Sequence, residues 1–90
     1  MEFRISNHAR EMLHERGLSD ADISEVLDSP EQVVEGDDGK TIYQSRKDFY
    51  GTLFLVRVIV EESLSPPLVV TAYMTTRIGK YWRLEDADKI

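Results

Sequence analysis

Apolar residues near the start of the chain recur at the spacing of an amphipathic helix. The apolar stripe consists of Ala9, Met12 and Leu13. Ser6 or Asn7 precedes it and can accept hydrogen bonds from the first N–H groups, whereas Gly17 can take the left-handed conformation that ends a helix. The pattern therefore predicts a helix that runs to about Arg16, with Leu18 supplying the apolar contact that accompanies such an end.

A second apolar stripe at helical spacing follows directly. It consists of Ile23, Val26 and Leu27. Ser19 is followed three residues later by Asp22, which is the pattern of a capping box, and Asp28-Ser29-Pro30 ends the helix. The two short helices predict an αα-hairpin.

From Gln32 onward the period changes to two, which is typical of strands. The predicted strands are residues 2–6, 32–35, 40–47, 52–61 and 68–75. Gly36-Asp37-Asp38-Gly39 predicts a hairpin turn, and the run from Ser63 to Pro67 predicts another. Because residues 52–61 are the most β-prone, we expect them to form the central strand.

These elements predict an α+β fold in the order β-α-α-β-β-β-β. We expect the αα-hairpin to pack on one face of a twisted, mainly antiparallel sheet. Arg77 to Leu84 are expected to form a short helix or a flap, and residues after Glu85 to fray. Ninety residues predict a single domain, 1–90.

Strand alternation predicts which side chains face the core. In the last strand the predicted core face consists of Leu68, Val70, Ala72 and Met74. The opposite face, a candidate shallow polar groove, consists of Val69, Thr71, Tyr73 and Thr75. Arg57 lies among aliphatic residues in the central strand and needs a partner. One of Arg46 and Lys47 must reach the exposed face.

Composition narrows the function classes. The chain carries 17 acidic and 11 basic residues, a net charge of −6, which argues against unspecific binding to nucleic acid. It contains no cysteine, its apolar runs are too short to span a bilayer, and its first residues do not resemble a signal peptide. We therefore expect a cytoplasmic protein that does not insert into membranes. Residues 63–84 contain bases but no acid, so one basic end is expected.

Both histidines lie in the first predicted helix. His8 and His14 are six residues apart, so they cannot chelate one metal ion as an i, i+4 pair would, and we predict no metal and no cofactor. His8 is a candidate general acid or base because imidazole titrates near neutral pH. The alternative is that His8 only fixes the start of the helix.

Two further features are candidates for RNA binding. Arg57 either binds an anion or forms an ion pair with an acid from the helices. The segment from Thr75 to Arg83 interleaves cations with aromatic residues, a plausible footprint for single-stranded RNA. The alternative is that Tyr81 and Trp82 close the open end of the core while the cations stay in water.

Several segments together resemble a known family. They are Ser-Asn-His-Ala-Arg, Glu-Arg-Gly-Leu-Ser, Leu-Asp-Ser-Pro-Glu-Gln-Val and Val-Val-Thr-Ala-Tyr. The chain resembles a prokaryotic family of small uncharacterised proteins grouped with the RelE/ParE-like toxins, near the BrnT branch. This resemblance implies a toxin of a toxin–antitoxin pair that cleaves messenger RNA, often on the ribosome, without a metal ion, and whose partner is a small antitoxin protein.

The resemblance also suggests roles for individual residues. The catalytic candidates are His8, Arg57 and Arg77, with His8 as base or acid and the arginines as phosphate clamps. The candidates for RNA contact are Arg46, Lys47, Tyr73, Lys80, Tyr81 and Arg83. Because such toxins are usually basic and this chain is acidic, the alternatives are a non-catalytic interaction module and a gyrase-inhibiting toxin. Exposed sheet edges predict strand-mediated docking of the antitoxin or formation of a homodimer.

Overall fold

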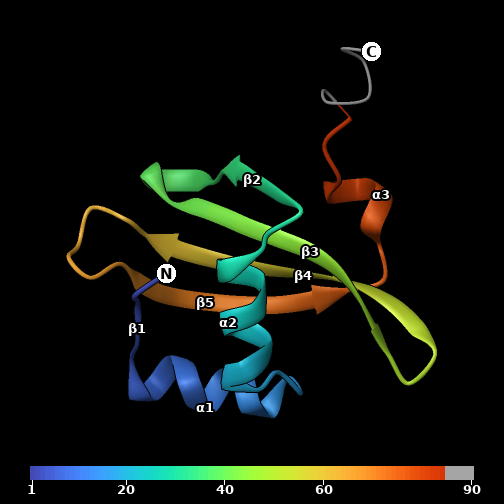
Figure 1. Cartoon of the computed structure of the whole chain (residues 1–90), viewed down its shortest axis with the longest axis horizontal. Helices are drawn as coiled ribbons and strands as arrows, with labels where there is room; N and C mark the ends of the chain where they lie inside the picture. Colours follow the sequence, from blue (N-terminus) through green and yellow to red (C-terminus); the bar gives the residue numbers. More distant parts are fainter. Residues whose placement is uncertain (85–90) are drawn as a thin grey trace.

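The computed structural model describes residues 1–84, which form a five-stranded mixed sheet with three α-helices (Figure 1). The order is β1 (Arg4–Ile5), α1 (Asn7–Glu15), α2 (Asp20–Asp28), β2 (Gln32–Glu35), the 3-10 turn η1 (Asp37–Gly39), β3 (Thr41–Phe49), β4 (Thr52–Glu61), β5 (Leu68–Thr75) and α3 (Ile78–Tyr81). The predicted α+β class is confirmed. The expected fraying after Glu85 concerns residues outside the described range.

Local side-chain chemistry sets the ends of α1. The Ser6 hydroxyl accepts a hydrogen bond from the Ala9 N–H at 3.1 Å, so Ser6 is the cap and Asn7 the first helical residue. Gly17 has a φ of 82°. The N–H of Leu18 donates to the carbonyl of Leu13 at 2.9 Å, a bond that spans this left-handed turn. The predicted glycine end is confirmed.

The start of α2 is equally local. Ser19 and Asp22 form the predicted capping box, since the Ser19 hydroxyl accepts from the Asp22 N–H and the Asp22 carboxylate accepts from the Ser19 N–H. The helix ends at Asp28, before Pro30, as the sequence predicts.

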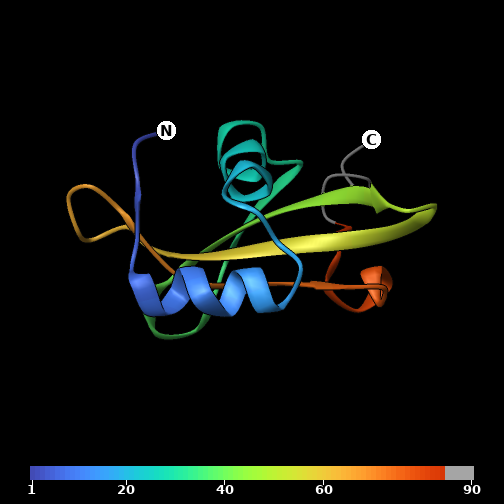
Figure 2. The ribbon, with the colours of Figure 1, turned by 90° about the horizontal axis from the view of Figure 1, so that it is seen from below.

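The sheet has the strand order β1-β5-β4-β3-β2, so β4 is the central strand as predicted. β1 pairs in parallel with the start of β5, and the other pairs are antiparallel. α1 runs alongside β5, whereas α2 and α3 lie on opposite sides of the sheet (Figure 2). α3 therefore covers only one end of the second face of the sheet.

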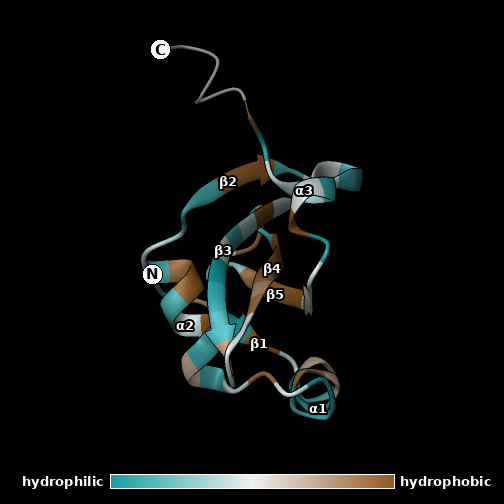
Figure 3. Cartoon of the chain, turned by 90° about the vertical axis from the view of Figure 1, so that its right-hand side faces the viewer, coloured by the Kyte–Doolittle hydropathy of each residue, from teal (hydrophilic) through white to brown (hydrophobic). Residues whose placement is uncertain are grey.

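The core lies between the sheet and the first two helices. Its buried members are Leu13, Leu18, Ile23, Val26, Leu27, Val56, Val58, Val60, Val69 and Ala72. β4 and β5 supply much of this set and are largely hydrophobic in Figure 3. Both helices contribute to the same cluster, but α2 packs over β3 and β4 whereas α1 lies beside β5 at the margin of the sheet, so only α2 packs on the face as predicted (Figure 2).

The predicted alternation along the last strand is wrong at its start. A register irregularity pairs Ile59 with Thr71 but Val60 with Val69, so Val70 is an extra residue in β5. Val69, predicted to line the groove, is fully buried in the core, and Val70, predicted to face the core, lines a cleft on the other face. Because a bulge adds one residue to a strand, it exchanges the two faces of the sheet for every residue on one side of it.

The outer edge of β5 is covered beyond its pairing with β1. β1 pairs with Leu68 and Val69. Further along, Arg16 donates to the carbonyl of Ala72 at 2.8 Å and to the hydroxyl of Thr71 at 3.1 Å. Because unpaired edge groups invite another strand, β1 and Arg16 together protect this edge.

Candidate functional site

A row of polar side chains crosses four strands on the face opposite α1 and α2. Gln32, Gln44, Arg57 and Tyr73 are direct cross-strand partners, one from each of β2, β3, β4 and β5. Gln44 Nε2 donates to Gln32 Oε1 at 2.8 Å, and Arg57 Nε donates to Gln44 Oε1 at 2.8 Å. Arg57 Nη1 donates to the Tyr73 hydroxyl at 2.6 Å. The row is one continuous hydrogen-bonded chain, called the polar row below.

Arg57 is the charged centre of the polar row. It is 9% exposed, and its guanidinium carbon lies 4.3 Å from the centre of the Tyr81 ring. Within residues 1–84 no carboxylate lies at ion-pair distance from it, so the ion pair with an acid from the helices is not formed. Because neutral groups satisfy only part of a guanidinium, its positive charge remains available to an anion.

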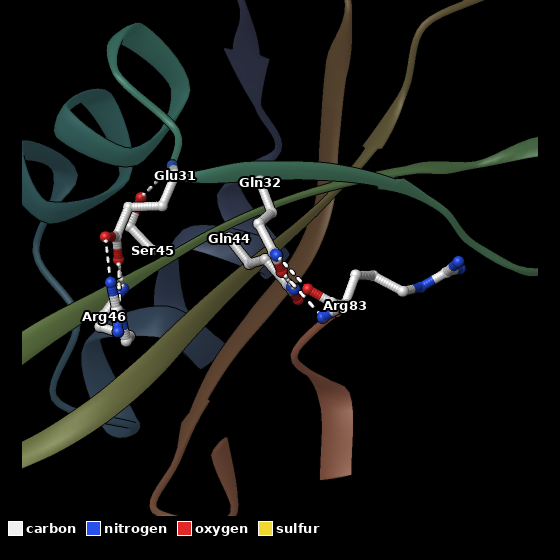
Figure 4. Close-up of polar contacts among 6 residues, drawn as sticks. All are labelled: Glu31, Gln32, Gln44, Ser45, Arg46 and Arg83. Atoms are coloured by element: carbon white, nitrogen blue, oxygen red, sulfur yellow. Dashed lines mark hydrogen bonds and ion pairs between the residues drawn. The ribbon is translucent and has the colours of Figure 1, made fainter. Parts of the chain in front are cut away.

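The segment around α3 is held over the polar row by backbone contacts. Gln44 Nε2 also donates to the Tyr81 carbonyl at 3.2 Å, and Gln32 Nε2 donates to the Arg83 carbonyl at 2.7 Å. The Arg83 N–H returns a bond to Gln32 Oε1 at 3.0 Å (Figure 4). Both amide side chains thus fix the position of Tyr81 relative to Arg57.

Two tyrosine hydroxyls lie beside the guanidinium. The rings of Tyr73 and Tyr81 pack edge to face, with centroids 6.2 Å apart. Hydrogen bonding to the Lys80 side chain lowers the pKa of Tyr81 below its ordinary value of 10.0. Hydrogen bonding to Tyr73 and the positive charge of Arg57 act in the same direction. At a given pH a larger fraction of Tyr81 is therefore ionised than of an isolated tyrosine, and only the ionised form can accept a proton.

An open cleft of about 340 Å³ adjoins this centre. It is lined by Gly36, Asp37, Asp38, Lys40, Ile42, Arg57, Ile59, Val70 and Tyr73. Arg57 Nη2 makes no hydrogen bond within the described part of the chain and is not buried, so this nitrogen can meet a ligand. The cleft thus offers a cation, a hydroxyl and an apolar floor.

The structure does not bring the three predicted catalytic residues together. His8 is exposed in the first turn of α1, close to where β1 pairs with the start of β5, whereas Arg77 follows the end of β5. An eight-residue strand is roughly 25 Å long, so His8 and Arg77 lie near its two ends. Neither of them lines the cleft that contains Arg57.

The residues predicted to contact RNA divide between the two faces. Tyr73 and Tyr81 lie against Arg57, and Lys80 lies over the ring of Tyr81. Lys47 lies on the other face, where it pairs with Asp22 and Glu25 of α2 at 2.9 and 2.6 Å.

Arg46 lies on the face of the polar row but is engaged by the protein. It stacks on Trp82 at 4.3 Å and pairs with Glu31 at 2.8 Å, and the Glu31 N–H donates to Ser45 (Figure 4). Arg83 contributes its backbone to the polar row rather than a cation. These contacts reduce the set of cations that face the cleft.

The pair of Glu31 and Arg46 predicts a small pH effect. Hydrogen bonding from Arg46 lowers the pKa of Glu31 below its ordinary value of 4.5, so the pair stabilises the fold above that value and the gain is lost as the pH falls through the folded-state pKa. Both side chains are more than a third exposed, so the gain is below about 1 kcal/mol. We expect Glu31→Gln to lower the urea-unfolding free energy at about pH 7 and not at about pH 2. An equal loss at both pH values would contradict this.

Sequence reasoning missed Gln32 and Gln44. Gln32 begins a strand that is otherwise apolar or charged, whereas Gln44 lies among mixed polar and apolar residues and is fully buried. Strand alternation could have placed Gln44 on the same face of its strand as Ile42 and Arg46. Only the strand register, however, sets it opposite Arg57.

Among residues 1–84 no group of three acidic or histidine side chains is placed to hold a metal ion. No helix in this range has both the length and the apolar character needed to cross a membrane.

Comparison with known proteins gives one match. Residues 5–74 match the sequence profile of a family described as a domain of unknown function (DUF4258). No curated protein and no solved structure matches the chain. The match covers the sheet up to β5, including Arg57 and Tyr73, and stops before α3 and Tyr81.

Proposed function

Because the chain belongs to the family DUF4258, whose function is unknown, we propose a function from the site: it binds single-stranded RNA at the cleft of Arg57 and cleaves it without a metal ion. The observation that carries this proposal is a buried arginine that lacks a carboxylate partner within residues 1–84 and has one free nitrogen beside an open cleft. A phosphodiester suits such a guanidinium, since its unbridged oxygens can accept from two N–H groups.

The surroundings of Arg57 support RNA rather than a free phosphate. Tyr73 and Tyr81 lie against the guanidinium, and Trp82 follows directly. Aromatic rings next to a cation are typical of sites for unpaired bases, because every base has a face that can stack.

The two tyrosines supply proton transfer. Cleavage requires that the ribose 2′-oxygen lose its proton and bond to phosphorus while the bond from phosphorus to the 5′-oxygen breaks. Tyr81, with its lowered pKa, accepts the first proton in its ionised form. The Tyr73 hydroxyl accepts from Arg57 and donates to the ionised Tyr81. Once Tyr81 has taken the 2′-proton, the hydrogen of Tyr73 is released from that bond and can protonate the leaving 5′-oxygen. In this proposal Tyr81 takes the role that the sequence suggested for His8.

The biological role in this proposal is that of a toxin with a small antitoxin protein as its partner. Its basis is the sequence resemblance to RelE/ParE-like and BrnT-like toxins, and free RNA or messenger RNA on the ribosome would be the substrate. Expression of the wild-type chain in a bacterium is then expected to arrest growth, and coexpression of its antitoxin to relieve the arrest.

A second candidate function is a non-catalytic interaction module. It is favoured by the net charge of −6 and by the position of His8 and Arg77 outside the cleft. This function predicts RNA binding or protein binding without any cleavage product.

The substitution Tyr81→Phe separates these functions. It removes the hydroxyl but keeps the ring on Arg57, so we expect kcat to fall about 100-fold while the affinity for RNA stays the same. The measurement is cleavage of a labelled single-stranded RNA in the presence of a metal chelator, as a function of pH. The wild-type rate should rise with pH until Tyr81 is ionised, and this rise should disappear in the variant.

The control is Tyr50→Phe. Tyr50 is fully exposed at the turn between β3 and β4 and does not line the cleft. Absence of cleavage by the wild-type protein would reject the nuclease and leave the interaction module. Equal losses in the two variants would reject the role of Tyr81.

A further inference from the structure

The cleft of Arg57 has a second, oppositely charged end. Arg57 and Tyr73 form one end, and Asp37 and Asp38 of η1 line the other. Within the described chain neither aspartate side chain makes an ion pair or a hydrogen bond. Asp38 has a φ of 55°, a left-handed conformation in which few residues other than glycine and asparagine or aspartate are stable.

The position of η1 over the cleft follows from close packing. A Cβ on Gly36 would meet Ile42 Cγ1 at 3.0 Å, so a larger residue here would require the Ile42 side chain to shift by a few tenths of an ångström. The Gly36 N–H donates to the Lys40 carbonyl at 2.9 Å, and Lys40 is itself engaged by Glu61 at 3.3 Å. Within residues 1–84 neither aspartate therefore forms an ion pair with Lys40, which is the cation nearest to them along the chain.

The distance between the two ends suits a nucleotide. Ile59 is two residues beyond Arg57 on β4 and pairs with Ile42, which is two residues from Lys40. Four residues along a strand span roughly 13 Å, and the long arginine side chain shortens the gap. Between the ends lies an apolar floor of Ile42, Ile59 and Val70, against which a base can lie flat.

We propose that this acidic end recognises the base of the bound RNA and that it selects guanine. The proposal rests on the proposed function, because Arg57 must hold the phosphate while an aspartate contacts the base. Guanine presents two adjacent N–H donors on its pairing edge, which match the two oxygens of one carboxylate. Adenine and cytosine present one amino group beside an acceptor, which a carboxylate repels, and uracil presents one N–H between two carbonyls.

The test is a binding titration of the full chain with the 5′-monophosphates of guanosine, adenosine, cytidine and uridine. Binding is measured by calorimetry or by NMR chemical shifts. Wild-type protein should bind guanosine monophosphate at least about 10-fold more tightly than the other three. In the double variant Asp37→Asn, Asp38→Asn this preference should fall to about 2-fold or less, while binding of uridine monophosphate persists.

The control is Glu35→Gln. It removes one negative charge next to η1, but Glu35 lies on the opposite face of β2 and does not line the cleft. The preference for guanine should survive this substitution. Because η1 is an exposed turn, the variants are expected to fold, and their thermal unfolding temperatures check this.

The outcomes separate the two proposals. Equal binding of all four nucleotides by the wild type, or an equal gain in affinity for all four in the double variant, would overturn the selection of guanine and leave the phosphate site intact. If none of the four nucleotides binds and inorganic phosphate does not bind either, the anion site itself fails, and the inference fails with it.

Discussion

Substitution of Arg57 by glutamine is expected to lower kcat/KM for RNA cleavage about 1,000-fold. The guanidinium is the cation that contacts the phosphate in the proposed site, and within residues 1–84 it has no carboxylate that would already neutralise it. Glutamine keeps a polar group for Gln44 but removes the charge and the bond to the Tyr73 hydroxyl. The loss should therefore appear in binding as well as in kcat, and growth arrest should disappear.

Two further variants make this result interpretable. Arg57→Lys keeps the charge but not the planar donor pair, so its loss should be intermediate, about 10-fold in affinity. Arg4→Gln removes an exposed cation on β1, near the other end of β5, and should change affinity less than 2-fold at moderate salt. If Arg4→Gln weakens binding as much as Arg57→Gln, the interaction is non-specific and the site assignment is wrong. Thermal unfolding of each variant shows whether the polar row still folds.

Substitution of Leu18 by alanine is expected to lower the free energy of unfolding by about 2–5 kcal/mol. Leu18 is 1% exposed, ends α1 through its bond to Leu13, and belongs to the core cluster between the helices and β4. Its truncation leaves a cavity where α1, α2 and the sheet meet. For a domain of this size the loss corresponds to a fall in unfolding temperature of roughly 10–30 °C.

The matched control for this prediction is Leu53→Ala. Leu53 is 50% exposed near the turn that joins β3 and β4, so its truncation should cost less than about 0.5 kcal/mol. Urea unfolding of both variants, followed by circular dichroism, compares the two values. A similar cost for the two leucines would show that Leu18 does not hold the helices to the sheet.

The elements predicted well are those whose ends depend on near neighbours in the chain. Ser6, Gly17 and the pair of Ser19 and Asp22 each act within five residues, so the ends of α1 and α2 follow from the sequence. The bounds of β2, β4 and β5 also agree, because turn residues lie directly beside them.

Features that depend on register could not be predicted. The polar row exists because Gln32, Gln44, Arg57 and Tyr73 are set opposite one another by four strands, and no local pattern encodes that alignment. The bulge at Val70 reversed the assignment of Val69 for the same reason. Arg57 itself was found, since a cation among aliphatic residues is conspicuous even without a known partner.

The candidate site could be predicted only in part. Arg57, Tyr73, Lys80 and Tyr81 meet as one group, but His8 lies near the opposite end of β5. The imidazole of His8 suggested a role in proton transfer, but the type of a residue does not indicate how far it lies from Arg57 in the folded chain. Conversely, the lowered pKa of Tyr81 arises from neighbours that only the folded chain supplies.

The protection of β5 limits how copies of this protein could assemble. β1 and Arg16 occupy one margin of the sheet, and β2 forms the other margin in the strand order. Two copies joined along β2 would make one continuous ten-stranded sheet whose two outer margins are both blocked. A sheet that grows by addition of further strands would then stop at two chains. The covered edge of β5 therefore limits such an assembly to a dimer and opposes the formation of filaments.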